Sequence, residues 1–194
     1  MIWAFGCSHT KQSDWTKYLS RPSLNLAING NSNEKILYQF LNEIGQSRVP
    51  SCVVIQWTHL TRFMIWDQPD KTFRSIIPAN ANFERLAQAN LNIEEQTMRW
   101  FYQFSCLEYH AKQSNIRVIH YHAEQPILIK ETLTNLLPKN SLRVIDQAEW
   151  VNDEMTVSSR QFYNHQHGLQ DDETGHWTEE SCRKFAGFVE SKIF

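Results

Sequence analysis

Short apolar runs alternate with helical stretches along the whole chain, and this alternation restricts the fold more than any other feature. The clearest run is Cys52–Trp57 (CVVIQW), which is continuous and rich in β-branched residues, as is typical of strands buried on both faces. Further strands are predicted at 2–5, 23–28, 116–122 and 141–146. Strands separated by helices favour a parallel sheet joined by right-handed crossovers. The pattern therefore predicts an α/β fold, a three-layer α/β/α sandwich around a five-stranded parallel sheet.

Helical periodicity predicts the elements between these strands. Helices are expected at 14–20, 31–45, 93–113, 126–137 and 178–194, the last of them opened by Thr178. Residues 67–90 fit neither pattern and are longer than an ordinary connection. We expect a single domain over 1–194 in which 67–90 is an insertion, either a lid over the functional cleft or a hairpin that seals a sheet edge far from it.

Composition and charge exclude several classes of function. The 194 residues are 41% hydrophobic and 21% charged, which suits one globular domain. A net charge of -2 without a basic run argues against nucleic-acid binding. No apolar stretch approaches the length that spans a membrane, and the start, MIWAFG, does not resemble a signal peptide. The four scattered cysteines predict free thiols and a cytoplasmic protein.

Reactive side chains follow the predicted strands. In open parallel sheets, ligands bind outside the carboxyl ends of the strands. The segments expected at that edge are GCSHT, NGNSN, THLTR and HYHAEQP, with LQDDETGHWT before the last helix. A serine hydroxyl needs an imidazole as base, the imidazole needs a carboxylate to orient it, and the developing oxyanion needs hydrogen-bond donors. These segments supply all of these groups, so they favour acyl transfer.

Four sequence blocks, in order along the chain, carry a family resemblance. The matching positions are Phe5-Gly6-Cys7-Ser8 with Trp15 and Leu19, Asn25-Leu26-Ala27 with Gly30, Ser32, Asn33 and Ile36, Val53–Trp57 with Thr58, and Gly175-His176 with Phe185-Ala186. Together they resemble the SGNH (GDSL-like) hydrolases, and most of all the small SGNH-like proteins of tailed bacteriophages. The resemblance implies a flavodoxin-like sheet with strand order 2-1-3-4-5 and a serine esterase or acylhydrolase.

The resemblance also implies a role for particular residues. Ser8 takes the place of the nucleophile and His176 that of the base, with Asp172 as the orienting acid and Glu173 as the alternative. Its oxyanion hole would consist of the backbone N–H groups of Ser8 and Gly30 with help from Thr58.

Three positions depart from the family pattern. Cys7 replaces the usual Asp, Thr58 replaces an Asn, and Glu173 rather than Asp172 lies three residues before the histidine. Gly175 could absorb the extra residue, because glycine bends the backbone without steric cost.

The substrate expected is a small-molecule or glycan-linked ester. Residues predicted to bind it are Asn33, His59, Arg62 and Trp177. No cofactor and no metal is expected, and the sequence leaves the oligomeric state open.

Two other functions remain open at this stage. One is a catalytically silent protein that binds a ligand in the same cleft, with Ser8 acting only as a turn or cap residue. The other is a metal-dependent phosphoester hydrolase that uses the pairs His120/His122 and His165/His167.

Overall fold

The computed structural model of the protein describes residues 1–46, 49–67, 69, 71–76, 92–122, 126–151, 164 and 167–194. The strands are β1 (Ile2–Phe5), β2 (Ser23–Asn25), β3 (Cys52–Trp57), β4 (Phe63–Asp67), β5 (Thr72–Ile76), β6 (Arg117–His122) and β7 (Glu149–Trp150). The helices are α1 (Ser8–Ser13), α2 (Asn33–Ile44), α4 (Ile93–Gln113), α5 (Pro126–Leu136), α6 (Arg143–Asp146) and α8 (Glu179–Ile193), with 3-10 turns η1 (Trp15–Tyr18) and η3 (Lys139–Leu142).

Five strands form the parallel sheet that the sequence predicts. Their order is β2-β1-β3-β6-β7, and each neighbouring pair is parallel. Since β4 and β5 pair with each other outside this sheet, the five strands follow the order 2-1-3-4-5 when they alone are numbered. The central strand β3 is buried along its whole length, as its unbroken apolar run predicts. The α/β class is confirmed.

The last strand of the sheet differs from the prediction. Residues 141–146 were expected to be a strand, but they lie in η3 and α6. Leu142 and Ile145 are three residues apart, so they share one side of a helical turn, and Ile145 is buried. The fifth strand is instead the two-residue β7, whose Trp150 is buried and stacks on Phe104 at 5.8 Å between ring centroids.

The chain after β1 also differs. A helix was expected at 14–20, but a helix already begins at Ser8, directly after the strand, and ends at Ser13. Asp14 then adopts a left-handed conformation (φ 39°), which Asp tolerates better than most residues. This break leaves only the short turn η1 of the expected helix.

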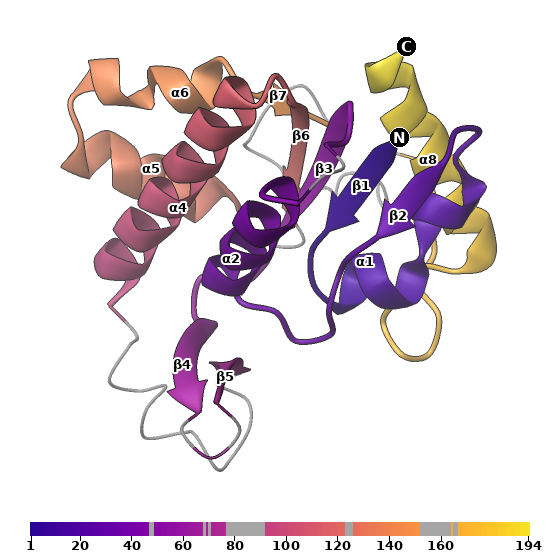
Figure 1. Ribbon diagram of the computed structural model, residues 1–194, viewed down its shortest axis with the longest axis horizontal. Helices are drawn as coiled ribbons and strands as arrows, with labels where there is room; N and C mark the ends of the chain where they lie inside the picture. The colour runs from indigo at the N-terminus through magenta and orange to yellow at the C-terminus, as the bar shows by residue number, and fades with distance from the viewer. Residues whose placement is uncertain are drawn as a thin grey trace.

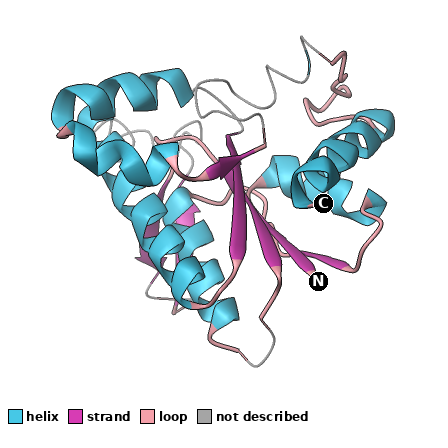
Figure 2. Ribbon diagram, turned by 90° about the horizontal axis from the view of Figure 1, so that it is seen from above, coloured by secondary structure: helices cyan, strands magenta, loops and turns pink. Residues whose placement is uncertain are grey.

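Helices cover both faces of the sheet (Figures 1 and 2). Alternate residues of β3 enter two separate cores, since successive side chains of a strand point to opposite faces. Val53, Ile55 and Trp57 pack with residues of α2, α4 and α5. Cys52 and Val54 pack with residues of η1 and α8 on the other face. The result is the three-layer sandwich.

The two long helices begin at side-chain caps. Asn92 accepts hydrogen bonds from the N–H groups of Glu94 and Glu95 at the start of α4, and Thr178 accepts one from Ser181 at the start of α8. Such caps satisfy N–H groups that have no partner within the helix. The predictions at 93–113 and 178–194 are therefore confirmed, including Thr178 as the opening residue.

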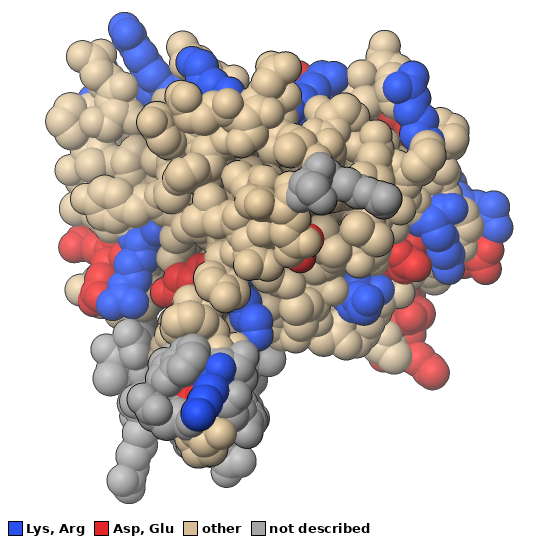
Figure 3. All heavy atoms as spheres, in the orientation of Figure 1, with Lys and Arg blue, Asp and Glu red and all other residues tan. Residues whose placement is uncertain are grey.

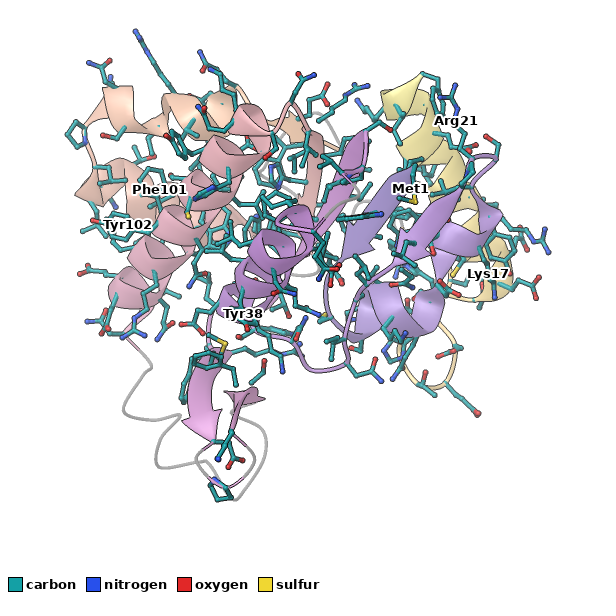
Figure 4. All side chains as sticks on the ribbon, in the orientation of Figure 1. Met1, Lys17, Arg21, Tyr38, Phe101 and Tyr102 are labelled. Atoms are coloured by element: carbon teal, nitrogen blue, oxygen red, sulfur yellow. The ribbon has the colours of Figure 1, made fainter. Side chains whose placement is uncertain are left out.

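Residues 67–90, which fit neither pattern in the sequence, begin within an antiparallel hairpin. Its strand β4 ends at Asp67 and pairs with β5. The hairpin packs on the first turns of α2: Ser75 Oγ accepts from Ser32 N at 2.9 Å, and the Phe73 ring lies 5.6 Å from that of Tyr38. Tyr38, labelled in Figure 4, lies on α2. Residues 77–91, with Phe83, and the side chains of Trp66 and Ile76 lie outside the described part, so the lid stays a prediction.

The exterior mixes positive and negative side chains. On the face in Figure 3, Lys and Arg lie among Asp and Glu rather than in one continuous basic area of the described surface. Several are paired along helices, as in Arg99–Glu95 on α4 and Arg183–Glu179 on α8. Among the described helices, none is both long and apolar enough to cross a bilayer.

Candidate active site

Ser8 lies in the turn that leads from β1 into α1. Cys7 is the N-cap residue and Ser8 the first residue of the helix. The Cys7 side chain is fully buried, whereas Ser8 is partly exposed. Ser8, not Cys7, is therefore accessible at the carboxyl edge of the sheet, where ligands bind in folds of this kind.

A buried glutamine holds this turn in place. Gln56 Oε1 accepts hydrogen bonds from Cys7 N at 3.0 Å, Thr10 N at 3.2 Å and Thr10 Oγ1 at 2.8 Å. Thr10 Oγ1 also lies 2.6 Å from the Tyr121 hydroxyl. Because the single proton of Thr10 goes to Gln56, Tyr121 is the donor in that contact. Sequence reasoning missed Gln56, although a glutamine in an otherwise apolar strand was the available signal.

The glycine before Cys7 is required by the same packing. A Cβ atom on Gly6 would lie 2.6 Å from Gln56 Oε1 and 2.7 Å from Thr10 Oγ1. Both contacts are far inside van der Waals range, so a larger residue would displace the glutamine that holds the turn. The glycine of the first sequence block is thus required in this chain for steric reasons.

The loop after β2 approaches the same turn. Gly30 has a φ of 72°, a conformation that favours glycine. The next residue, Asn31, donates from Nδ2 to Gly6 O at 3.2 Å and to Gln39 Oε1 at 2.6 Å. The backbone of Gly30 is therefore held beside the segment that carries Ser8.

Thr58, directly after β3, is fixed by its backbone. The Asn33 amide accepts from Thr58 N at 2.8 Å and donates to Thr58 O at 3.2 Å. Arg62 donates from Nη1 to Thr58 Oγ1 at 2.9 Å, and Arg62 N bonds His59 O. The Asn33 side chain is buried and engaged in positioning Thr58, which differs from the expected contact with substrate.

His176 lies in a tight turn before α8. Asp172 N donates to His176 O at 2.6 Å, and Gly175 N donates to Asp172 O at 3.0 Å. Gly175 closes the turn with a φ of 77°, so the extra residue between the acid and the histidine is accommodated as the sequence suggested.

The carboxylate of this turn reaches the imidazole through a third side chain. Asp172 Oδ1 accepts from Thr174 N at 2.8 Å, Thr174 Oγ1 at 2.6 Å and His176 N at 3.2 Å. Thr174 Oγ1 is in turn 2.8 Å from His176 Nδ1. The hydrogen bonds from Thr174 and His176 lower the pKa of Asp172, which is ionised at neutral pH. Glu173 is exposed, and its side chain has no hydrogen bond to another described residue.

The turn is anchored to the helix that begins with Ser8. The rings of His176 and His9 are 5.1 Å apart. Trp177 N donates to Ser13 Oγ at 3.3 Å, and the Cys182 thiol donates to Ser13 O at 2.9 Å. Segments about 160 residues apart in the chain are thereby joined at one end of the sheet.

The position of Trp177 does not support its predicted function. Trp177, expected to contact substrate, is 8% exposed. Its ring packs 4.5 Å from Phe185, and its Nε1 donates to Asn164 Oδ1. Trp177 is therefore part of the core under α8, although the next residue before it, His176, is partly exposed; this position differs from the expected contact with substrate.

The first histidine pair is buried among aromatic rings. His120 accepts from Trp57 Nε1 at Nδ1, and its Nε2 lies 2.8 Å from Glu108. His122 packs between Trp100 and Trp150, and burial lowers its pKa to about 3, so it is neutral near pH 7. Among the described residues no three His, Cys, Asp or Glu side chains come together as metal ligands do; His165 lies outside them.

Comparisons with known proteins identify the fold. The chain is similar in structure to a member of the lipolytic G-D-S-L family from Veillonella parvula, with 13% identity and a TM-score of 0.55 over 98% of this chain and 96% of that one. It is also similar to a GDSL-like lipase from Bacteroides thetaiotaomicron (15% identity, TM-score 0.53, 99% and 86% covered). A lipase from a goat rumen metagenome gives 11% identity and a TM-score of 0.52 over 98% and 95% of the chains.

Sequence comparisons add no closer relative. No protein-family model matches the chain, and no curated protein matches it. The structural likeness, at these identities, establishes the fold.

Proposed function

We propose that this protein is a serine esterase of the SGNH type that hydrolyses a small ester through an acyl-enzyme on Ser8. The observation that carries the proposal is the anchoring of the His176 turn to α1, the helix that begins with Ser8. The neighbours of the same fold are described as lipases and lipolytic proteins, which supports ester hydrolysis.

The residues of this edge divide the reaction between them. His176 takes the proton of the Ser8 hydroxyl as Ser8 attacks the ester carbonyl. The N–H groups of Ser8 and Gly30, with the Thr58 hydroxyl, stabilise the negative charge on the carbonyl oxygen. The imidazolium returns its proton to the leaving alcohol. Water then resolves the acyl-enzyme, with His176 again as base.

Burial of the Cys7 side chain beside the partly exposed Ser8 supports serine rather than cysteine chemistry, and two of the other thiols are kept protonated. The cysteines are free, and burial raises the pKa of both Cys52 and Cys182 to about 11. Protonated thiols are weak nucleophiles. Free thiols are also what a reducing compartment favours, so we place the protein in the cytoplasm, that of the host cell if a phage encodes it.

The substrate proposed is a small or glycan-linked ester. Arg62 and His59, in the turn after Thr58, lie next to the proposed oxyanion donor. Of the four residues predicted to bind substrate, these are the two to which we assign that role.

One observation favours a second candidate, a catalytically silent binding protein. No carboxylate among the described residues hydrogen-bonds directly to the His176 imidazole; Asp172 reaches it only through Thr174. A silent member would keep the turn and the cleft without turnover.

A screen of acyl esters separates the two candidates. We expect wild-type protein to hydrolyse short-chain p-nitrophenyl esters, acetate to octanoate, above the rate of buffer and of heat-denatured protein. The optimum chain length then reports the size of the acyl pocket. The absence of hydrolysis of every ester, by protein that is folded by circular dichroism, would support the silent binding protein instead.

A further inference from the structure

The hydroxyl of Thr174 lies between the two groups that a serine hydrolase normally pairs directly. It is 2.6 Å from Asp172 Oδ1 and 2.8 Å from His176 Nδ1. We infer that Thr174 is a positioning residue that couples the carboxylate of Asp172 to the imidazole of His176 and sets the tautomer of that imidazole. The effect on catalysis rests on the proposed function, whereas the tautomer follows from the hydrogen bonds alone.

The tautomer follows from counting protons. A threonine hydroxyl has one proton to donate. The Asp172 carboxylate accepts from three donors and is ionised at neutral pH, so it takes the proton of Thr174. The contact between Thr174 Oγ1 and His176 Nδ1 then needs a proton on Nδ1. The lone pair of the neutral imidazole is therefore on Nε2, the nitrogen that a general base must present to Ser8.

The spacing in the sequence gives the hydroxyl its place. His176 follows Asp172 by four positions, whereas the spacing is three in the family that the chain resembles. Gly175 has a positive φ and closes the longer turn. The longer turn thus leaves a gap between the carboxylate and the imidazole, and the Thr174 hydroxyl occupies this gap.

A neutral bridge differs chemically from a direct carboxylate. The hydroxyl fixes the ring and the tautomer, but the negative charge lies farther from the imidazolium, so its stabilisation is weaker. The titratable side chains that the structure describes around His176 and its turn are Asp172 and Glu173 in the turn itself, His9 from α1 and the Cys182 thiol from α8. We therefore expect the imidazole to depend on Thr174 for its orientation and on Asp172 for part of its basicity.

The test compares Thr174→Val with Thr174→Ser and with the matched control Thr134→Val. Thr134 lies on α5, and among the described residues its hydroxyl bonds to Lys130 O of the same helix alone. Long-range ¹H–¹⁵N spectra report which nitrogen of His176 carries the proton, and spectra of His176→Gln assign the signals. In wild type, Thr174→Ser and Thr134→Val we expect the proton on Nδ1. In Thr174→Val we expect a mixture of the two tautomers.

Kinetics provide the second readout. With the best ester of the screen, Thr174→Val should lower kcat by roughly 10- to 100-fold, within the range of general-base effects, with little change in KM. Thr174→Ser should restore kcat.

The outcomes separate this inference from the proposed function. A proton on Nε2 of His176 in the wild type, or an unchanged tautomer in folded Thr174→Val, would overturn the role of Thr174. If Thr174→Val does not fold, the wild-type tautomer decides alone. Spectra as expected in a protein that hydrolyses no ester would support the role of Thr174 and count against the esterase.

Discussion

Replacing Ser8 by alanine should reduce ester hydrolysis by roughly 10⁴-fold or more, because the reaction loses its attacking oxygen. Ser8 is the first residue of α1, and its side chain caps nothing in the described chain. The fold should therefore be unaffected, and the thermal unfolding midpoint should stay within a few degrees of the wild type. The measurement is kcat/KM with the best ester of the screen.

Cys7→Ala is the matched control for this variant. Cys7 is the adjacent small side chain, and its contact with Gln56 uses only its backbone N–H. We expect Cys7→Ala to keep substantial activity. Activity that survives in Ser8→Ala but is lost in Cys7→Ala would assign the nucleophile to the cysteine.

Gln56→Leu should produce the largest loss of stability. Leucine has a similar volume but no acceptor, so the Cys7 N–H and the Thr10 hydroxyl would lose the oxygen to which they donate, whereas the Thr10 N–H keeps its bond to Cys7 O. A buried unsatisfied donor costs about 1–3 kcal/mol. Losing the acceptor of both donors should lower the free energy of unfolding by about 2–4 kcal/mol, and the unfolding midpoint by about 5–10 °C. Activity should fall as well, because the turn that carries Ser8 loses its support.

Gln46→Leu tests whether any such exchange is harmful. Gln46 is exposed after α2, and surface exchanges usually change stability by less than 0.5 kcal/mol. Chemical denaturation of both variants gives the two free energies. Equal stability of Gln56→Leu and the wild type would show that the hydrogen bonds to Gln56 are not what holds the turn.

The sheet could be predicted from the sequence because it depends on local patterns. Short, mainly apolar runs predicted β1, β3 and β6, and periodicity with a capping residue predicted α4 and α8. The prediction failed where tertiary contacts decide. Residues 141–146 contain apolar positions that suit a strand or a helical turn, and the packing of Ile145 and Trp150 selects the helix followed by β7.

The candidate site was predicted in outline but not in its connections. The order of the blocks placed Ser8 and His176 at one edge, and the structure brings their segments together. The sequence pattern could not show which side chains would be engaged in contacts within the protein and so be unable to contact substrate. Asn33 is engaged by the Thr58 backbone, Trp177 by the core, and Asp172 by Thr174. Each depends on side-chain directions that spacing alone does not specify.

The central claim is that the Ser8 hydroxyl becomes acylated during turnover. The most direct measurement is to incubate the native protein with a fluorophosphonate probe, which traps activated serines, and to map the adduct by peptide mass spectrometry. We predict one adduct, on the peptide that contains Ser8, absent from Ser8→Ala and strongly slowed in His176→Gln. An unlabelled wild-type protein that nevertheless hydrolyses esters, or an adduct on another residue, would contradict the account.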